Sequence, residues 1–278
     1  MYADLHTHTN YSDGNVEVED LVKLAKEKGT KVLAIADHDT VFHYDRIKEA
    51  CDQYGIKSVW GIELSCYDFS VNKKVHILGL GFKDYPVNVE AKGKQALAGR
   101  DNYHKKMIKM LNEKGYDITY EDAKKHSKYN IVFKRHLFDA IVEKYPEMKD
   151  ASKYRELFLN TGFSNADLEM DYIPVDEGIE AIHKDGGIAI LAHPCLYSNY
   201  PEIEKYVAYG LDGLEVSHPE MKAEDYVKTK EIVEKFDLIA TGGSDFHDFL
   251  LTPDMGEYGI TEGQYKVVEE KIKFRNDK

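Results

Sequence analysis

Seven short apolar runs, rich in β-branched residues, recur along this 278-residue chain and constrain its fold more than any other feature. Strand–helix alternation of this kind predicts an α/β fold with a parallel sheet covered by helices, either open or closed. About seven strands suit a barrel related to the eight-stranded type. The first expected strand runs from about residue 2 to residue 8 and begins with YADLH. The other expected strands are residues 31–37, 57–66, 75–82, 187–193, 211–217 and 238–245. The expected helices are 17–28, 41–54, 101–115, 119–126, 134–144, 151–160, 176–184, 201–208, 221–235 and 262–274.

The alternation stops between about residues 84 and 175, where the pattern is mostly helical and contains no convincing strand. No repeat or low-complexity linker marks a second independent domain. We therefore predict one barrel, formed by residues 1–84 and 176–278. A helical insertion, residues 85–175, interrupts it as a cap or substrate-recognition subdomain.

Histidine, aspartate and glutamate gather where the predicted strands end. In barrels of this kind the chemistry lies at the C-terminal ends of the strands. One residue is an exception, because His76 opens its strand instead of ending it. Residues two apart on a strand point the same way, so a strand over residues 2–8 would aim Asp4, His6 and His8 at one side. The other polar residues at strand ends are Asp13, Asp37, His38, Asp39, Glu63, His193, Glu215, His218, Asp245 and His247.

Each of these groups taken alone has a structural explanation, such as a turn at SDG, a helix N-cap at DHDT or a strand stop at AHP. Their joint placement is harder to explain in this way, because buried ionisable groups need a partner that offsets their desolvation. Nitrogen and oxygen ligands without thiolates suit Zn²⁺, Mn²⁺ or Fe²⁺ better than Ca²⁺. About nine candidate ligands exceed the needs of one tetrahedral ion and suit two or three ions bridged by a carboxylate.

Composition excludes several classes of protein. The formal charge of −13 argues against a binder of long duplex DNA, although it permits a small anionic substrate. No apolar run approaches the ~20 residues that span a bilayer, and the start has no basic signal-peptide region, so we expect no membrane association. The three cysteines, Cys51, Cys66 and Cys195, form neither a disulfide framework nor a zinc site and indicate a reducing cytoplasm.

The motifs HTHTNYSDG, ADHDT, GIELS, the isolated His76, AHP and SDFHD resemble the successive motifs of the PHP family, named for polymerase and histidinol phosphatase. The match runs from the first residues to about residue 250, and the stand-alone phosphoesterases of that family also carry a helical insertion. The resemblance implies a distorted (β/α)7 barrel with a trinuclear metal centre. It implies one ion held by His6, His8, Glu63 and Asp245, a second by Asp13, His38 and His247, and a third by Glu63, His76 and His193.

The resemblance also implies an activity, hydrolysis of phosphate esters by a metal-bridged hydroxide. Asp13 occupies a position where some relatives have histidine, and it favours the branch acting on small molecules and nucleotides, including short RNA, over the histidinol phosphatases. Asp39 and His218 are candidates to carry protons to the leaving group. Asp4 and Asp37 are candidates to orient ligand histidines by accepting their second N–H.

The insertion must supply the contacts to the rest of the substrate. The family carries an arginine-rich helix and an R-x-H-like segment there, and the matching stretches are AGRDNYHKKM and VFKRHLFDA. Lys134 stands where arginine is usual, and a lysine binds phosphate as a point charge without the bidentate fork. The candidates for the substrate phosphate are Arg100, Lys134, Arg135 and His136. Tyr103 and Tyr129 could stack on a base, but packing explains them better.

Three other functions stay open at this point. A histidinol-phosphatase-type enzyme is disfavoured by Asp13. A metal-dependent amidohydrolase also begins with H-x-H, but commonly bridges its metals with a lysine where this chain has Glu63. A non-catalytic nucleic-acid accessory module of a polymerase would tolerate a decayed ligand set, whereas every implied ligand is present here. The sequence leaves the native metal and the oligomeric state undetermined.

Overall fold

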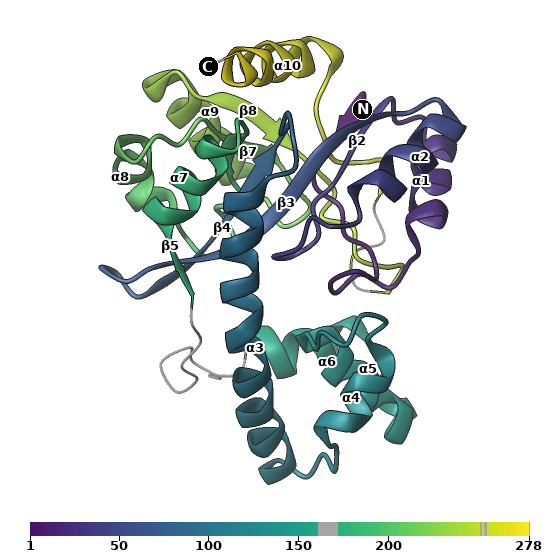
Figure 1. Cartoon of the computed structure of the whole chain (residues 1–278). Coiled ribbons are helices and arrows are strands. Elements are labelled where there is room, and N and C mark those ends of the chain that lie inside the picture. Colours follow the sequence, from purple (N-terminus) through teal and green to yellow (C-terminus); the bar gives the residue numbers. More distant parts are fainter. Residues whose placement is uncertain (161–171, 251, 253–254, 278) are drawn as a thin grey trace.

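A computed structural model describes residues 1–160, 172–250, 252 and 255–277. Seven strands lie side by side and form a nearly closed barrel, from which one long helix leads away to a separate helical part (Figure 1). The predicted seven-stranded barrel is confirmed. Along the sheet the strands are β1 (Ala3–Asp4), β2 (Val32–Ile35), β3 (Lys57–Asp68), β4 (Lys73–Leu80), β6 (Ile188–Leu191), β7 (Gly213–Ser217) and β8 (Ile239–Gly242).

The expectation of an all-parallel sheet is wrong at β4. This strand runs antiparallel to both of its neighbours, β3 and β6, because the short segment 69–72 turns the chain straight back without a crossover helix. The start of β4 therefore lies at the same edge as the C-terminal ends of the parallel strands. His76, the one exception to the sequence pattern, thus lies opposite Ser65 near the end of β3.

Two further expectations about strands need correction. The first strand is only two residues long, and beyond it the chain continues along β8 through a hydrogen bond from Leu5 N to Gly242 O and a bridge between Thr7 and Phe246. The region expected to contain no strand has a short one, β5 (Ile173–Pro174), which pairs with the end of β3.

The helices around the barrel begin and end within about three residues of their predicted bounds. In the first of them, Val18, Leu21, Val22 and Ala25 recur at helical spacing and are buried against the sheet and the neighbouring helix. No helix in the described ranges is both long and apolar enough to cross a membrane. These helices are α1 (Val18–Glu27), α2 (Tyr44–Tyr54), α7 (Val175–Lys184), α8 (Ile203–Ala208), α9 (Ala223–Phe236) and α10 (Glu262–Asn276).

The long helix α3 (Val87–Glu113) begins 14 residues earlier than predicted. Its first half packs on the barrel, where Val89 and Ala96 join the barrel core. Its second half carries Met107 and Leu111 into a second core, that of the separate helical part, which we call the cap and which extends from the second half of α3 to residue 160. A helix that serves two cores in succession has no single apolar face, so periodicity shows only part of it. The cap also contains α4 (Tyr120–His126), α5 (Lys134–Lys144) and α6 (Ala151–Arg155), which continues as a π-helical turn over Glu156–Asn160.

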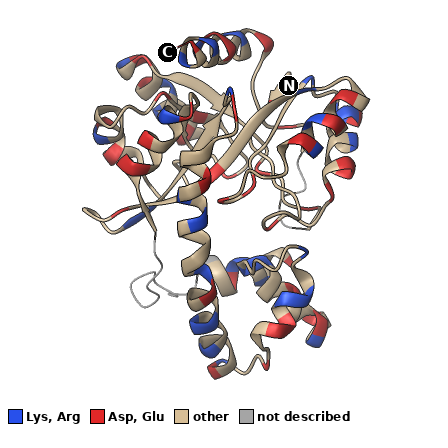
Figure 2. Cartoon of the chain, viewed as in Figure 1, with Lys and Arg blue, Asp and Glu red and all other residues tan. Residues whose placement is uncertain are grey.

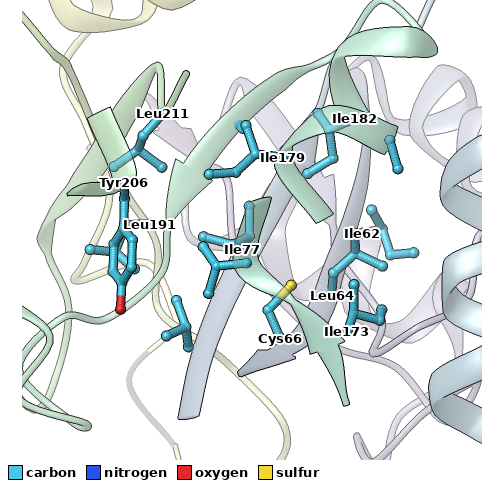
Figure 3. Close-up of a cluster of buried hydrophobic side chains, with 14 of the residues drawn as sticks. Ile62, Leu64, Cys66, Ile77, Ile173, Ile179, Ile182, Leu191, Tyr206 and Leu211 are labelled. Carbon is cyan, nitrogen blue, oxygen red and sulfur yellow. The ribbon is translucent and has the colours of Figure 1, made fainter. Parts of the chain in front are cut away.

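One face of the β3–β4 hairpin packs against α7. Ile62, Leu64 and Ile77 point toward Ile179 and Ile182 in the cluster that Figure 3 shows. Each of these side chains is fully buried, and burial of such a side chain stabilises the fold by about 1.5–3 kcal/mol. Because side chains alternate along a strand, the opposite face of this rigid hairpin carries the polar residues between them.

Candidate metal centre

Four side chains converge on one point: His6 and His8 follow β1, Glu63 lies within β3, and Asp245 follows β8. The Nε2 atoms of His6 and His8 lie 3.1 Å apart. Both nitrogens also approach Glu63 Oε2, at 3.3 and 3.2 Å, and Asp245 Oδ1, at 3.3 and 3.1 Å. One ligand atom from each residue lies within 4.8 Å of all the others, which is the arrangement that a bound cation requires.

A second group lies beside the first. Asp13 Oδ1 is 3.4 Å from His247 Nε2, and Asp13 Oδ2 is 3.7 Å from His38 Nε2. The other nitrogen of the His8 ring, Nδ1, lies 3.8 Å from Asp13 Oδ1 and adds His8 to this group. The structure thus brings together the three residues implied for the second ion and places a histidine of the first group next to them.

Glu63 joins these groups to a third. Its Oε1 atom lies 2.7 Å from His76 Nδ1 and 2.8 Å from His193 Nε2, while Oε2 lies 3.2 Å from His38 Nδ1. One carboxylate oxygen therefore faces one pair of histidines, and the other oxygen faces the rest of the centre. A carboxylate placed in this way could supply ligand atoms to more than one ion.

Backbone conformation at the strand ends aims these side chains. His193, with a φ of 25°, and Asp245, with a φ of 47°, adopt positive φ angles that side-chain-bearing residues rarely adopt. Such residues cluster at functional sites, where the surrounding structure holds them. Close packing contributes as well, because a Cβ on Gly243 would lie 2.4 Å from the Cβ of His6. Only glycine lets the chain just after β8 pass this close to His6.

The ionisation of each carboxylate and imidazole in this site depends on its charged neighbours. Burial opposes ionisation of Glu63, but the neighbouring imidazoles of His38, His76 and His6 hold the pKa of its carboxyl well below the usual value. Burial likewise disfavours a charged His8, yet its hydrogen bonds to Asp245 and Glu63 raise its pKa to about 10. Buried carboxylates thus attract positive charge to this site, and divalent cations supply that charge without protonating the histidines.

The donor set fits divalent transition metals. His8 Nδ1 and His193 Nδ1 are buried without a hydrogen-bond partner among the described residues. Unpaired buried acceptors are costly unless a ligand satisfies them. Imidazole and carboxylate ligands suit zinc, manganese or iron, and the sharing of Glu63 and His8 among three groups fits a polynuclear site.

Glu215 orients two of the candidate ligands, a role that the sequence analysis gave to other residues. Its Oε1 lies 3.1 Å from His6 Nδ1, and its Oε2 accepts a hydrogen bond from the backbone N–H of His193. Asp4 instead accepts hydrogen bonds from Ser244, and Asp37 contacts Thr9, Ser12 and His43, so neither touches the ring of a candidate ligand. The position of Glu215 at the end of a strand, in EVSHP, was the available signal.

The two proposed proton carriers occupy different environments. His218 lines the cavity beside the centre, with its Nε2 3.3 Å from Asp245 Oδ2 and its Nδ1 accepting from the backbone N–H of Glu220. Asp39 is buried and accepts hydrogen bonds from the backbone N–H of Ser65 and from the Arg100 guanidinium. Asp39 therefore holds Arg100 in place.

A cavity of about 480 Å³ opens between the barrel and the cap next to these ligands. Arg100 and Lys134 line it, as the sequence analysis expected of phosphate-binding residues. Arg135 does not, because it forms buried ion pairs with Asp139 and Asp248. His136 does not line it either, since its Nδ1 accepts a hydrogen bond from Phe133 N at the start of α5.

Several cavity residues were not identified from the sequence. Lys74 precedes His76 by two residues on β4 and therefore shares its face, which was a usable signal. The aromatic wall has no comparable signal, because its residues come from separate segments that only the fold brings together. Tyr103 belongs to this wall, whereas Tyr129 stacks on Tyr11, at 4.0 Å between ring centroids, outside the cavity. The other aromatic residues of the wall are Phe133, Tyr154, Tyr172 and Tyr197.

Comparison with known proteins agrees with this geometry. The PHP domain matches residues 4–203. The chain is 34% identical to phosphoribosyl 1,2-cyclic phosphate 1,2-diphosphodiesterase of Eggerthella lenta over 89% of its own length and 94% of the relative. It is 29% identical to a 5′-3′ exoribonuclease of Haemophilus influenzae over 88% and 89% of the two chains.

The overall structure is similar to that of a candidate metal-dependent phosphoesterase from Bifidobacterium adolescentis. The TM-score is 0.86 at 26% sequence identity, and the match covers 98% of this chain and 96% of the other. The matched region contains both the barrel and the cap. The family match, the relatives that align over most of their length and the similar solved structure all agree with the site geometry described above. The chain belongs to the PHP domain family.

Proposed function

We propose that this protein, a phosphoric ester hydrolase of the PHP family, hydrolyses small nucleotides or short RNA with two or three divalent ions at the Glu63-bridged centre. The observation that carries the proposal is the set of three adjoining ligand groups, two of which share Glu63, in the wall of a cavity that also has cationic side chains. Relatives that act on a cyclic phosphoribosyl phosphate and on RNA support a nucleotide-like substrate.

Ions bound here would activate water for attack on phosphorus and balance the negative charge that develops in the transition state. The protein's own groups have complementary roles. Arg100 and Lys134 would bind phosphate oxygens, and the Arg100 guanidinium is already fixed by Asp39 and Ser65 Oγ, at 2.5 and 2.7 Å. Such preorganisation lowers the entropic cost of binding the substrate in one orientation.

His218 is the better supported of the two candidate proton carriers. Because its Nδ1 accepts a backbone N–H, its proton lies on Nε2, which faces Asp245 and the cavity. Asp39 has no such freedom while it is paired with Arg100. We therefore assign proton transfer to the leaving group to His218 and a positioning role to Asp39.

The test is a hydrolysis screen with Mn²⁺ over nucleoside mono- and bisphosphates, short RNA and histidinol phosphate. We expect phosphate release from a nucleotide or RNA substrate and a loss of at least about 100-fold in His38→Ala, a value typical of losing a ligand or its orientation. His126→Ala, at a surface histidine paired with Glu143, is the matched control and should behave as the wild type. Full activity in His38→Ala would contradict the assignment of the centre.

The metal content gives an independent readout. Protein purified without chelators should contain more than one equivalent of manganese, iron or zinc, and His38→Ala should contain less.

All three cysteines are free thiols, which supports a reducing compartment such as the cytoplasm.

A further inference from the structure

Three aromatic rings form a continuous stack between the barrel and the cap, outside the cavity. The ring centroid of Tyr11 lies 3.9 Å from that of His43 and 4.0 Å from that of Tyr129, with interplanar angles of 7° and 12°. Two rings that lie this close and this parallel to a third must cover its opposite faces. His43 precedes α2 in the barrel, whereas Tyr129 lies between α4 and α5, so the middle ring is held between the two parts of the protein.

The loop between β1 and α1 that carries Tyr11 also carries the candidate ligand Asp13, two residues further on. The chain turns sharply here, and the backbone N–H of Gly14 donates to Thr9 O at 3.0 Å. We call residues 9–14 the Asp13 turn. Because so compact a turn moves as a unit, the position of the tyrosine ring bears directly on that of the carboxylate.

The barrel anchors one side of the Asp13 turn through a single carboxylate. Asp37 is fully buried and accepts hydrogen bonds from Thr9 N and Oγ1, at 2.8 and 2.6 Å, and from Ser12 Oγ, at 2.6 Å. His43 Nε2 lies 2.7 Å from the same carboxylate, so the imidazole that covers one face of Tyr11 is itself fixed. The opposite face of the ring is the one that the cap covers.

Ion pairs join the cap to the barrel at the edge of the stack. Arg46 donates to the hydroxyl of Tyr11 at 3.2 Å and pairs with Glu17 at 3.0 Å. Lys128 of the cap pairs with the same glutamate. Figure 2 shows acidic and basic residues together on α1 and α2, the helices that follow Glu17 and His43. Partly exposed ion pairs contribute little each, so the ring stack accounts for the larger part of this contact.

We propose that Tyr129 is a positioning residue for the metal centre: by stacking on Tyr11, the cap holds the Asp13 turn in place and completes the second ligand group. This inference rests on the metal centre of the proposed function but not on its substrate. It makes the affinity for one ion depend on the cap. The dependence is reciprocal, because a cap contact that favours ion binding must itself be strengthened, by the same factor, when the ion is bound.

The first test measures Mn²⁺ binding to metal-free protein, followed by the electron paramagnetic resonance of the free ion. Tyr129→Ala should bind one of its equivalents about 3- to 10-fold less tightly than the wild type, the range that the loss of one aromatic pair supports. Tyr129→Phe keeps the stacked ring and should bind as the wild type does. Tyr116→Ala is the matched control, because this partly buried cap tyrosine contacts the ring of Tyr145 within the cap, and it should also leave binding unchanged.

Asp13→Ala identifies the ion that is affected. If the cap acts through the Asp13 turn, Tyr129→Ala should cause no further loss of Mn²⁺ affinity once the Asp13 carboxylate is absent. Independent effects, with the same 3- to 10-fold loss in both backgrounds, would mean that Tyr129 acts by another route and would overturn the inference.

Hydrogen exchange of the metal-free protein gives a readout that needs neither metal nor substrate. The amides of Ser12 and Gly14, which both donate to Thr9 O, should exchange at least about 3-fold faster in Tyr129→Ala than in the wild type or in Tyr116→Ala, with the barrel strands unchanged. Faster exchange throughout the chain would mean that Tyr129 only stabilises the fold, and unchanged exchange in the turn would mean that the cap does not hold it. Either result would overturn the inference. A wild type that binds no Mn²⁺ would refute the proposed function, whereas the exchange comparison would still decide whether the cap holds the turn.

Discussion

Replacing Gly93 with alanine should separate the long helix α3 from the loop that carries Asp39 and the candidate ligand His38. Gly93 lies within the half of α3 that packs on the barrel. A Cβ at this position would lie 2.3 Å from Asp39 O and 2.9 Å from Asp39 C. Both are backbone atoms and cannot rotate away, so α3 or the loop must move by about 1 Å to restore an ordinary contact.

The size of the effect follows from two opposing terms. Alanine in a helix interior is favoured over glycine by about 1 kcal/mol. Overpacking a close contact costs typically about 1–3 kcal/mol, and here Asp39 is held further by its hydrogen bonds to Arg100 and Ser65. These terms leave a net loss of up to about 2 kcal/mol in the free energy of unfolding. We also expect weaker substrate binding, because Arg100 lies two turns from Gly93 on the same helix.

Gly263→Ala is the matched control. This glycine lies in α10, and a Cβ there would meet no atom within 4 Å, so helix propensity acts alone and should stabilise the protein by up to about 1 kcal/mol. Urea unfolding of both variants would measure the two changes, and KM would report on Arg100. The two substitutions should have opposite signs. If Gly93→Ala were as stabilising as Gly263→Ala, the close packing of α3 on the Asp39 loop would be refuted.

Further predictions concern the centre and two buried ion pairs. Glu63→Gln should lower the metal content and abolish measurable hydrolysis while the metal-free protein stays folded, and a full metal complement in this variant would contradict the bridging role. Treatment with a chelator should lower both activity and Tm, and Mn²⁺ should restore them, because ions that bind only the folded state stabilise it. Asp212→Asn should destabilise the protein by about 2–3 kcal/mol at pH 7, since burial of Asp212 is outweighed by its bonds to His183 and Arg275, which hold its pKa below the usual value. That contribution is present above about pH 4 and is lost as pH falls toward the folded pKa, so acid unfolding should show a smaller difference between variant and wild type. Arg135→Met should cost about 3–5 kcal/mol in stability because the buried Asp248 carboxylate loses its ion-pair partner, with KM for the substrate unchanged within about twofold.

The positions of the candidate metal ligands could be predicted from the sequence because local pattern and global fold agree there. A short apolar run ends, a histidine or carboxylate follows, and parallel strands bring their ends to one edge. The direction of β4 could not be predicted in the same way, because a four-residue connection between two apolar runs fits a hairpin as well as a continued strand. Once that direction is known, His76 follows the same rule as the other residues.

The contacts made by the insertion were harder to predict, for a physical reason. Lys134, Arg135 and His136 are consecutive, and the sequence places all three on one short helix turn without showing which of them faces the cavity. The structure answers this through a distant partner, since Asp248 pairs with Arg135 and turns it away. The orienting role of Glu215 was missed for a similar reason, because its partners His6 and His193 lie far away along the chain.

The β3–β4 hairpin positions two of the candidate ligands together with one cation of the cavity wall. In its antiparallel register Ser65 pairs with His76 and Tyr67 pairs with Lys74, so Glu63, His76 and Lys74 lie on one face while the other face is packed in the apolar core. The spacing between these side chains is therefore set by a rigid two-stranded unit rather than by the helical part of the chain that carries Lys134.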